Sequence, residues 1–236
     1  IIAPTYGAAV DTVTEEPDVD YPVINGPVNV VVSDGVGGWF IGGEFTRVGS
    51  VDRFGLAHIL ANNEVDPDWH PAVGDRSNTS QLPTVKALAL EGDVLLVGGR
   101  FTSMGDIRRQ NLAAVSKTGT VLGWSETGAD GEVNALAVSN GVVYIGGSFE
   151  NISGARRSCL AALGIADGNA TAWQVDAEWD VVLNSRRCSV DALVSAGDTI
   201  YVGGVFRQLG SERRMGIGAV STSGQVLTWN PAIAGN

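Results

Sequence analysis

The chain has 236 residues, 44% of them hydrophobic, which is enough to bury a substantial core. Its net charge of −11 and pI near 4.5 argue against a general nucleic-acid binder and against attraction to anionic lipid, because both need a basic surface. No apolar run approaches the roughly 20 residues of a membrane-spanning helix, and no basic and apolar leader opens the chain. We therefore expect a protein that neither binds nucleic acid nor inserts into a membrane.

Residues 1–27 contain no repeated motif and are expected to form an extended N-terminal segment. From residue 28 onward one pattern occurs four times, and residues 28–236 are predicted to form one domain. The copies contain WFIGGEFTRVGSVDRFGLAHI (39–59), LLVGGRFTSMGDIRRQNLAAV (95–115), VYIGGSFENISGARRSCLAAL (143–163) and IYVGGVFRQLGSERRMGIGAV (200–220). Each copy ends at a tryptophan 26 or 27 residues after the first glycine of its glycine pair. The full copies extend over about residues 28–73, 84–128, 132–176 and 189–233.

Each copy is predicted to form four short strands. The first strands are Val28–Val32, Val85–Leu90, Val133–Val138 and Val190–Val194. Each is followed by a turn pair that accepts positive φ and favours a tight hairpin, namely Asp34-Gly35, Gly92-Asp93, Asn140-Gly141 or Gly197-Asp198. The second strand carries the glycine pair, and the third strands are Gly55–Leu60, Leu112–Val115, Leu160–Leu163 and Ile217–Val220. The fourth strand ends at the tryptophan, and no segment shows a helical period over three turns.

Four-stranded antiparallel units of about 40 to 50 residues are typical of a β-propeller. The second strands are apolar on both faces, as Tyr144 and Ile145 show, so each needs a sheet packed on either side. The sequence therefore predicts an all-β fold, a β-propeller of four-stranded antiparallel blades with four repeats. Two arrangements remain open: the four blades close by themselves, or they belong to a larger ring completed by another fragment or subunit.

Three phrases carry a resemblance to a known family: GGWFIGGEF (37–45), RRQNLAAV (108–115) and WNP (229–231). They resemble the delta-60 type β-propeller repeats of bacterial secreted and surface proteins, over about residues 28 to 233. The resemblance implies a propeller in an extracellular or envelope-associated protein, and it brings no general catalytic motif. The third copy departs from the pattern at Ser153-Gly154 and at Cys159, where the second copy has Asn111.

Two repeated motifs have both a functional and a structural interpretation. The glycine pairs, Gly42-Gly43, Gly98-Gly99, Gly146-Gly147 and Gly203-Gly204, could cradle phosphate, but no helix is expected after them. Close approach of neighbouring sheets, or a bulge, explains them better. The recurrent arginines Arg53, Arg109, Arg157 and Arg214 could form a ring of cations for an anionic glycan or a carboxylate partner. Because all four copies have one, a structural role as a fork for loop carbonyls is favoured.

The repeated tryptophans Trp69, Trp124, Trp173 and Trp229 could stack on sugars, although packing between blades is favoured because they recur. Trp179 breaks the repeat and lies in a long insertion, VDAEWDVVLNSRRC (175–188), which makes it the better candidate for partner binding.

The chain has two cysteines, Cys159 and Cys188, for which a disulfide is favoured over free thiols. A metal site is not expected, because the two histidines, His58 and His70, lie in another copy. Asp66-Pro-Asp68 and Asp18-Val-Asp20 lack the spacing of a calcium loop. No cofactor is therefore predicted.

These observations favour a non-enzymatic extracellular β-propeller scaffold that mediates protein or glycan binding at the cell surface. The irregular loops 70–84, 125–132 and 174–189 are the segments expected to carry binding. One alternative is a structural subunit of a surface filament, layer or larger assembly, which associates with further blades or subunits through open blade edges. Another is a polysaccharide-acting enzyme that uses carboxylates near a ring axis, although no Ser-His-Asp set or cofactor motif occurs.

Overall fold

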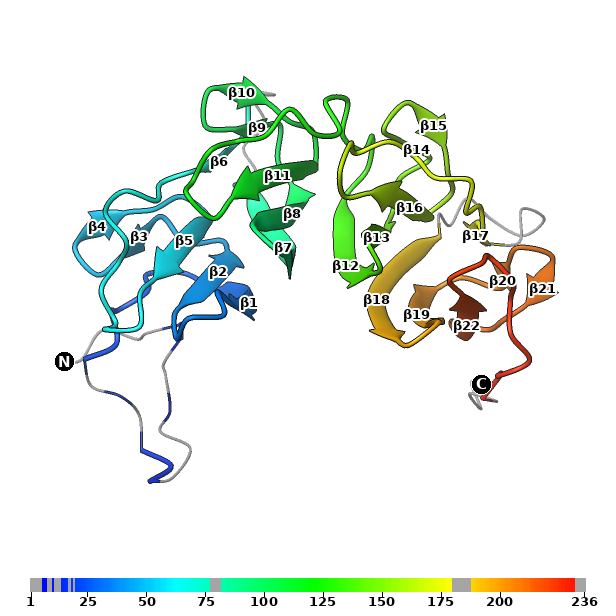
Figure 1. Cartoon of the computed structure of the whole chain (residues 1–236), viewed down its shortest axis with the longest axis horizontal. Helices are drawn as coiled ribbons and strands as arrows, with labels where there is room; N and C mark the ends of the chain where they lie inside the picture. The colour runs from blue at the N-terminus through cyan, green and yellow to red at the C-terminus, as the bar shows by residue number, and fades with distance from the viewer. Residues whose placement is uncertain are drawn as a thin grey trace. The chain divides into compact units, whose positions relative to one another are not determined.

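The computed structural model describes residues 6–7, 10, 14–16, 18, 20–76, 82–179 and 188–231, and this part of the chain is all-β (Figure 1). Within it, no helix is long and apolar enough to cross a membrane. The chain divides into two compact units, one formed by residues 1–109 and 114–122, the other by residues 110–113 and 123–236. The first and second copies lie essentially in the first unit, and the third and fourth copies lie in the second.

Each copy forms an antiparallel sheet of three strands, with its second strand in the middle. In the first unit the sheets are β1 (Val28–Ser33), β2 (Trp39–Gly43) and β5 (Leu56–Ile59), and β7 (Thr84–Glu91), β8 (Val94–Arg100) and β11 (Leu112–Ser116). In the second unit they are β12 (Val133–Ser139), β13 (Val142–Gly147) and β16 (Leu160–Gly164), and β18 (Ser189–Ala196), β19 (Thr199–Val205) and β22 (Ile217–Ser221). The apolar runs that surround each glycine pair therefore form strands where the pattern predicts them.

A short hairpin joins the second strand of each copy to its third strand. The four hairpins are β3 (Arg47–Val48) with β4 (Val51–Asp52), β9 (Ser103–Met104) with β10 (Ile107–Arg108), β14 (Asn151–Ile152) with β15 (Ala155–Arg156), and β20 (Gln208–Leu209) with β21 (Glu212–Arg213). The segment that precedes each sheet pairs with the hairpin of the same copy, through β6 (Val73–Gly74), β17 (Ala177–Glu178) or single bridges at Ile24 and Ala129.

The prediction of a fourth strand in each copy is wrong, because the sheet of each copy has three strands. The segment before each tryptophan makes a single bridge to the third strand, as between Val115 and Val121. Two backbone hydrogen bonds flank that bridge, from Ser116 N to Thr120 O and from Leu122 N to Ala114 O. The ladder stops there because the carbonyl of Leu122 accepts a hydrogen bond from the side chain of Arg109 instead. The same side-chain bond occurs in the other three copies.

The turn after the first strand is tight in three copies, where Gly92-Asp93, Asn140-Gly141 and Gly197-Asp198 link directly paired residues. The first copy differs, because Ser33 pairs with Trp39 across five intervening residues. In that longer loop the carboxylate of Asp34 accepts hydrogen bonds from the backbone N–H groups of Val36 and Gly38, both at 2.8 Å. The extra residues bring a buried carboxylate into the first copy.

The core of each copy is built on the aromatic residue that follows its glycine pair. Phe45, Phe101, Phe149 and Phe206 are each at most 2% exposed. Burying a phenylalanine side chain contributes roughly 1.5–3 kcal/mol, so the four rings are a major part of the core.

Candidate functional site

The first glycine of two pairs lies where a neighbouring sheet approaches, and the second glycine of every pair lies beside the bulge of the first strand. A β-carbon on Gly42 would lie 2.4 Å from Cγ1 of Val85 in the next sheet, and one on Gly146 would lie 2.4 Å from Cγ1 of Val190. At the second glycines a carbonyl oxygen of the bulged strand lies 2.0–2.2 Å from a β-carbon placed on Gly43, Gly99, Gly147 or Gly204. At these positions the close approach of another sheet or of a backbone carbonyl excludes a β-carbon, which is why glycine is needed there.

The recurrent arginines act as forks between backbone carbonyls. Arg53, Arg109, Arg157 and Arg214 each donate from Nη1 to the carbonyl of the preceding residue and from Nη2 to a carbonyl of the segment before the tryptophan, at 2.7–3.0 Å. Arg53, Arg109 and Arg214 are each 7% exposed. Because both ends of each fork bind backbone, these side chains hold the fold together and present no ring of free cations.

Three of the repeated tryptophans pack against the sheet of the following copy. Trp69, Trp124 and Trp173 are 1%, 3% and 7% exposed. Their Nε1–H groups donate to carbonyls at the end of the next third strand, on Ser116, Gly164 and Ser221, at 3.0–3.3 Å. Trp229 differs, because it is 43% exposed.

Cys159 and Cys188 form a disulfide, as their spacing and context favour. The bond links the start of β16 to the residue before β18, and both cysteines belong to the core cluster between the third and fourth sheets. It closes a loop of 29 residues, for which the entropic account gives a stabilisation of about 3–4 kcal/mol.

Trp179 is half-buried, and the guanidinium of Arg207 lies over its ring, 4.7 Å from the centroid. Such a cation–π contact contributes roughly 0.5–2 kcal/mol and orients the cation. Arg207 is further positioned by its backbone N–H, which donates to the carbonyl of Glu178 at 2.8 Å. The rest of the predicted insertion, residues 180–187, lies outside the described residues, as do residues 77–81 of the loop at 70–84.

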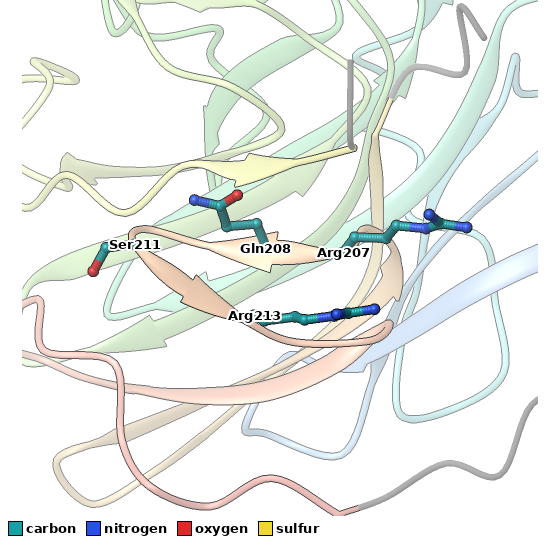
Figure 2. A pocket seen from close by; sticks show the side chains of 4 residues that line it. All are labelled: Arg207, Gln208, Ser211 and Arg213. Atoms are coloured by element: carbon teal, nitrogen blue, oxygen red, sulfur yellow. The ribbon is translucent and has the colours of Figure 1, made fainter. Parts of the chain in front are cut away.

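Next to this stack lies a small pocket of about 220 Å³ lined by Arg207, Gln208, Ser211 and Arg213. Figure 2 shows the side chains of Arg207 and Arg213 extending in the same direction from the β20–β21 hairpin. Both guanidinium groups can donate several hydrogen bonds, and neither has a carboxylate partner among the described residues. The neighbouring Glu212 is directed to another cation, with its carboxylate 3.7 Å from Nη1 of Arg214.

Arg207 and Trp179 are individual to the fourth copy, whereas Arg213 has arginine counterparts at Arg108 and Arg156. Arg207 directly follows the repeated phenylalanine of the fourth copy. In the other copies this position is Thr46, Thr102 or Glu150. In every copy the segment before the sheet pairs with the hairpin, and this pairing aligns the four segments. In that alignment the position of Trp179 is taken by Gly26, Asp75 or Gly131 in the other copies. In a chain of net charge −11, the basic pocket is a local concentration of positive charge.

A second polar cluster is buried in the first copy. The imidazole of His58 lies between two carboxylates, with Nδ1 2.8 Å from Asp66 Oδ2 and Nε2 3.1 Å from Asp34 Oδ2. His58 also stacks on Phe40, with ring centroids 4.3 Å apart. Since the two nitrogens point in opposite directions, the carboxylates do not converge on one point. No group of three or more metal-binding side chains is found among the described residues.

The pKa values of both carboxyls are lowered from 3.8. Burial acts in the opposite direction, but it is outweighed by hydrogen bonds from His58 and from backbone N–H groups, of Val36 and Gly38 to Asp34 and of Asp68 and Trp69 to Asp66. Both carboxylates therefore stay ionised well into the acid range.

Sequence reasoning did not identify either polar cluster. The sequence pattern places Asp34 in a turn and offers His58 only as a possible metal ligand. Arg207 could have been found by asking which copy places arginine where the others have threonine or glutamate, whereas Arg213 has arginine counterparts at Arg108 and Arg156. The proximity of Arg207 and Arg213 to Trp179 depends on the pairing of β17 with β20, which the sequence pattern does not contain.

No protein-family model matches the chain, and no curated protein matches it. Among solved structures, the chain is similar to the crystal structure of the computationally designed Ika8 protein, with 13% sequence identity and a TM-score of 0.47. The match covers 91% of this chain and 64% of Ika8, so the chain spans less than two thirds of the length of that protein. This likeness assigns neither a family nor a function.

Proposed function

We propose that the chain is a non-enzymatic, extracellular β-propeller scaffold that binds a carboxylate-bearing glycan through the pocket of the fourth copy. The observation that carries the proposal is the meeting of Trp179, Arg207 and Arg213 at the hairpin of the fourth copy. The repeated residues are engaged in structural contacts, so the individual side chains are the ones free to select a ligand.

The propeller interpretation is supported by the repetition of one sheet and one hairpin in all four copies. Propeller blades pack face to face, and the contacts of Gly42 with Val85 and of Gly146 with Val190 are of that kind. The resemblance to the delta-60 type repeats of bacterial surface proteins is consistent with this arrangement. The disulfide supports an oxidising and hence extracellular location, because such bonds persist outside the cytosol.

The chemistry of the pocket favours an anionic group of modest size. Its volume of about 220 Å³ is below the roughly 300–1,000 Å³ of pockets for drug-sized ligands, so it suits one charged group of a larger molecule. Planar guanidinium groups match the geometry of a carboxylate, and charge-assisted hydrogen bonds are the strong ones. A uronic acid residue combines a carboxylate with hydroxyls that can bond to Gln208 and Ser211 and with carbon faces that can pack on indole.

The non-enzymatic part of the proposal is supported by the hydrogen bonds and the burial of His58. Both of its ring nitrogens are engaged by carboxylates, and the residue is 8% exposed. A general base needs an accessible nitrogen lone pair within reach of its substrate, which this arrangement does not provide.

Binding is tested by isothermal titration calorimetry of the chain with oligogalacturonate, with a neutral oligosaccharide of equal length as the ligand control. We expect binding of the acidic oligomer alone, and a roughly ten- to hundredfold loss of affinity for Arg207→Gln and for Arg213→Gln. The matched control is Arg156→Gln, because Arg156 is the exposed equivalent of Arg213 in the third copy. Equal binding by all three variants, or equal binding of the neutral oligomer, would contradict the proposal.

A further inference from the structure

The junction between the third and fourth copies repeats a backbone contact and adds further bonds to it. In three places the segment before a sheet donates a backbone N–H to the residue that follows the fork arginine of the preceding copy. These hydrogen bonds run from Val73 to Phe54, from Ala129 to Gln110 and from Ala177 to Ser158, at 2.9–3.1 Å. The last of them lies at the base of the insertion that carries Trp179.

Two side chains reinforce the contact at this base. The hydroxyl of Ser158 donates to the carbonyl of Ala177 at 3.0 Å, and the carboxylate of Asp176 accepts the backbone N–H of Ser158 at 2.8 Å. The counterparts of Asp176 are Val23, Ala72 and Gly128. Because none of the three has a side-chain acceptor, this pair of bonds is individual to the segment before the fourth sheet.

The disulfide holds the other end of the insertion at the very next residue. Cys159 directly follows Ser158 and is bonded to Cys188, whose Sγ lies 3.4 Å from Oγ of Ser158. A sulfur atom in a disulfide carries no hydrogen, so the hydroxyl is the donor here, and the carbonyl of Ala177 is the stronger acceptor for its single proton. Two adjacent residues, Ser158 and Cys159, therefore hold the chain at residues 176–177 and again at residue 188.

The backbone at Cys159 does not itself call for a cysteine. Its φ is +61°, in the left-handed region. The counterparts in the other copies are Gly55, Asn111 and Gly216, which are residue types that accept this conformation readily. The bond to Cys188, and not the backbone conformation, accounts for the cysteine in the third copy.

Trp179 follows the clamped residues almost directly. Only Glu178 separates it from Ala177, and the carbonyl of Glu178 accepts the backbone N–H of Arg207 at 2.8 Å. The indole ring then lies against the guanidinium of Arg207, 4.7 Å from the ring centroid. A displacement of Ala177 is thus carried within two residues to the ring that orients the cation of the pocket.

We propose that Ser158, Asp176 and the Cys159–Cys188 disulfide form a clamp that positions Trp179 against Arg207, and that ligand affinity in the basic pocket depends on this clamp. The clamp residues are positioning residues, since the pocket is lined by other side chains and the clamp acts on it through Trp179. The inference rests on the proposed function for its ligand, but the contact between indole and guanidinium can be measured without one.

The first experiment is nuclear magnetic resonance of the intact chain with isotope-labelled arginine. The ring current of an indole shifts the protons of a side chain lying over its face upfield, and Trp179→Ala gives the reference without that ring. The clamp variants are Ser158→Ala, Asp176→Ala and the double variant Cys159→Ser/Cys188→Ser. We expect the Arg207 side-chain protons of the wild type to lie upfield of the reference, and those of each clamp variant to move toward it.

Two control variants separate the clamp from a general loosening of the fold. Gln110→Ala changes the counterpart of Ser158 in the second copy and leaves the backbone bond from Ala129 in place. Asp176→Asn keeps an acceptor oxygen. Both are expected to retain the wild-type Arg207 resonances. Amide spectra report whether each variant folds, and should the double cysteine variant not fold, Ser158→Ala and Asp176→Ala decide, because both keep the disulfide.

The second experiment is calorimetric titration of the same variants with oligogalacturonate. Each clamp variant is expected to bind roughly three- to tenfold more weakly, the range expected when a contact between indole and guanidinium is lost. Gln110→Ala should bind as the wild type does. In a Trp179→Ala background the clamp variants should cause no further loss, because the clamp acts through that ring.

The outcomes distinguish the clamp from the proposed function. Arg207 resonances without an upfield shift in the wild type, or with the same shift in all folded clamp variants, would overturn the clamp. An equal change in Gln110→Ala, or an equal loss of affinity in the Trp179→Ala background, would also overturn it. A wild type that shows the upfield shift but does not bind oligogalacturonate would contradict the proposed function, and movement of the Arg207 resonances in the clamp variants alone would still support the clamp.

Discussion

A single residue gives the first copy its own electrostatic character. His58 occupies a position that is alanine in the other copies, at Ala114, Ala162 and Ala219. Its imidazole bridges two carboxylates that come from the turn after β1 and from the segment before Trp69. A buried ionic cluster of this kind depends on every member, because removing one leaves the others without compensation.

The His58 cluster predicts a loss of stability in acid. The folded pKa values of Asp34 and Asp66 lie below 3.8, so their contribution is fully present above that value and is lost as the pH falls through the lowered values. His58→Ala is expected to cost on the order of 3 kcal/mol at neutral pH, with a smaller difference from wild type in strong acid. Thermal unfolding from neutral to acid pH measures this, and a difference that stays constant would contradict it.

The arginine forks predict a second effect at the residue scale. Arg109→Met leaves the carbonyls of Arg108 and Leu122 without their side-chain donor, and we expect a loss of about 2–3 kcal/mol in the free energy of unfolding. Arg108→Met is the control, because Arg108 is exposed and is expected to change stability by less than about 0.5 kcal/mol. Urea unfolding measures the free energy of unfolding of both variants. Equal losses in the two would contradict a stabilising role for the Arg109 fork.

At the scale of elements, the strands follow from the sequence more closely than the segments between them. The apolar runs around each glycine pair predict the first three strands of every copy. The repeat also predicts a fourth strand that ends at the tryptophan, yet the arginine side chain takes a carbonyl that a longer ladder would need. The pairing of this segment is short because an arginine donor competes for the backbone carbonyl, and the local sequence pattern does not reveal that competition.

The same substitution at two equivalent glycines tests how neighbouring sheets constrain the central strands. Gly146→Val places a side chain against Val190 in the next sheet and is expected to cost about 1–3 kcal/mol or more from overpacking. Gly203→Val meets only Ala192 of its own sheet, at 3.7 Å, and should cost less than about 1 kcal/mol. Chemical unfolding at low protein concentration compares them, and similar losses would show that sheet-to-sheet contact is not what selects glycine.

At the scale of the whole molecule, net charge opposes association between copies of the chain. Each chain carries −11. The Debye length falls from roughly 30 Å at 0.01 M salt to about 8 Å at 0.15 M, so we expect self-association to strengthen as salt is added. Sedimentation at both salt concentrations measures this, and weakening with added salt would indicate a contact driven by opposite charges instead.

The sequence by itself determined the fourfold repeat, the all-β class, the position of the strands around each glycine pair and the pairing of Cys159 with Cys188. These follow from local spacing and from the small number of cysteines, and both can be read along the chain. The tertiary structure decided the rest: the acceptors of the arginine forks, the His58 cluster and the basic pocket beside Trp179. Each of these joins residues far apart in sequence, and the distances between such residues are set by strand register and sheet packing.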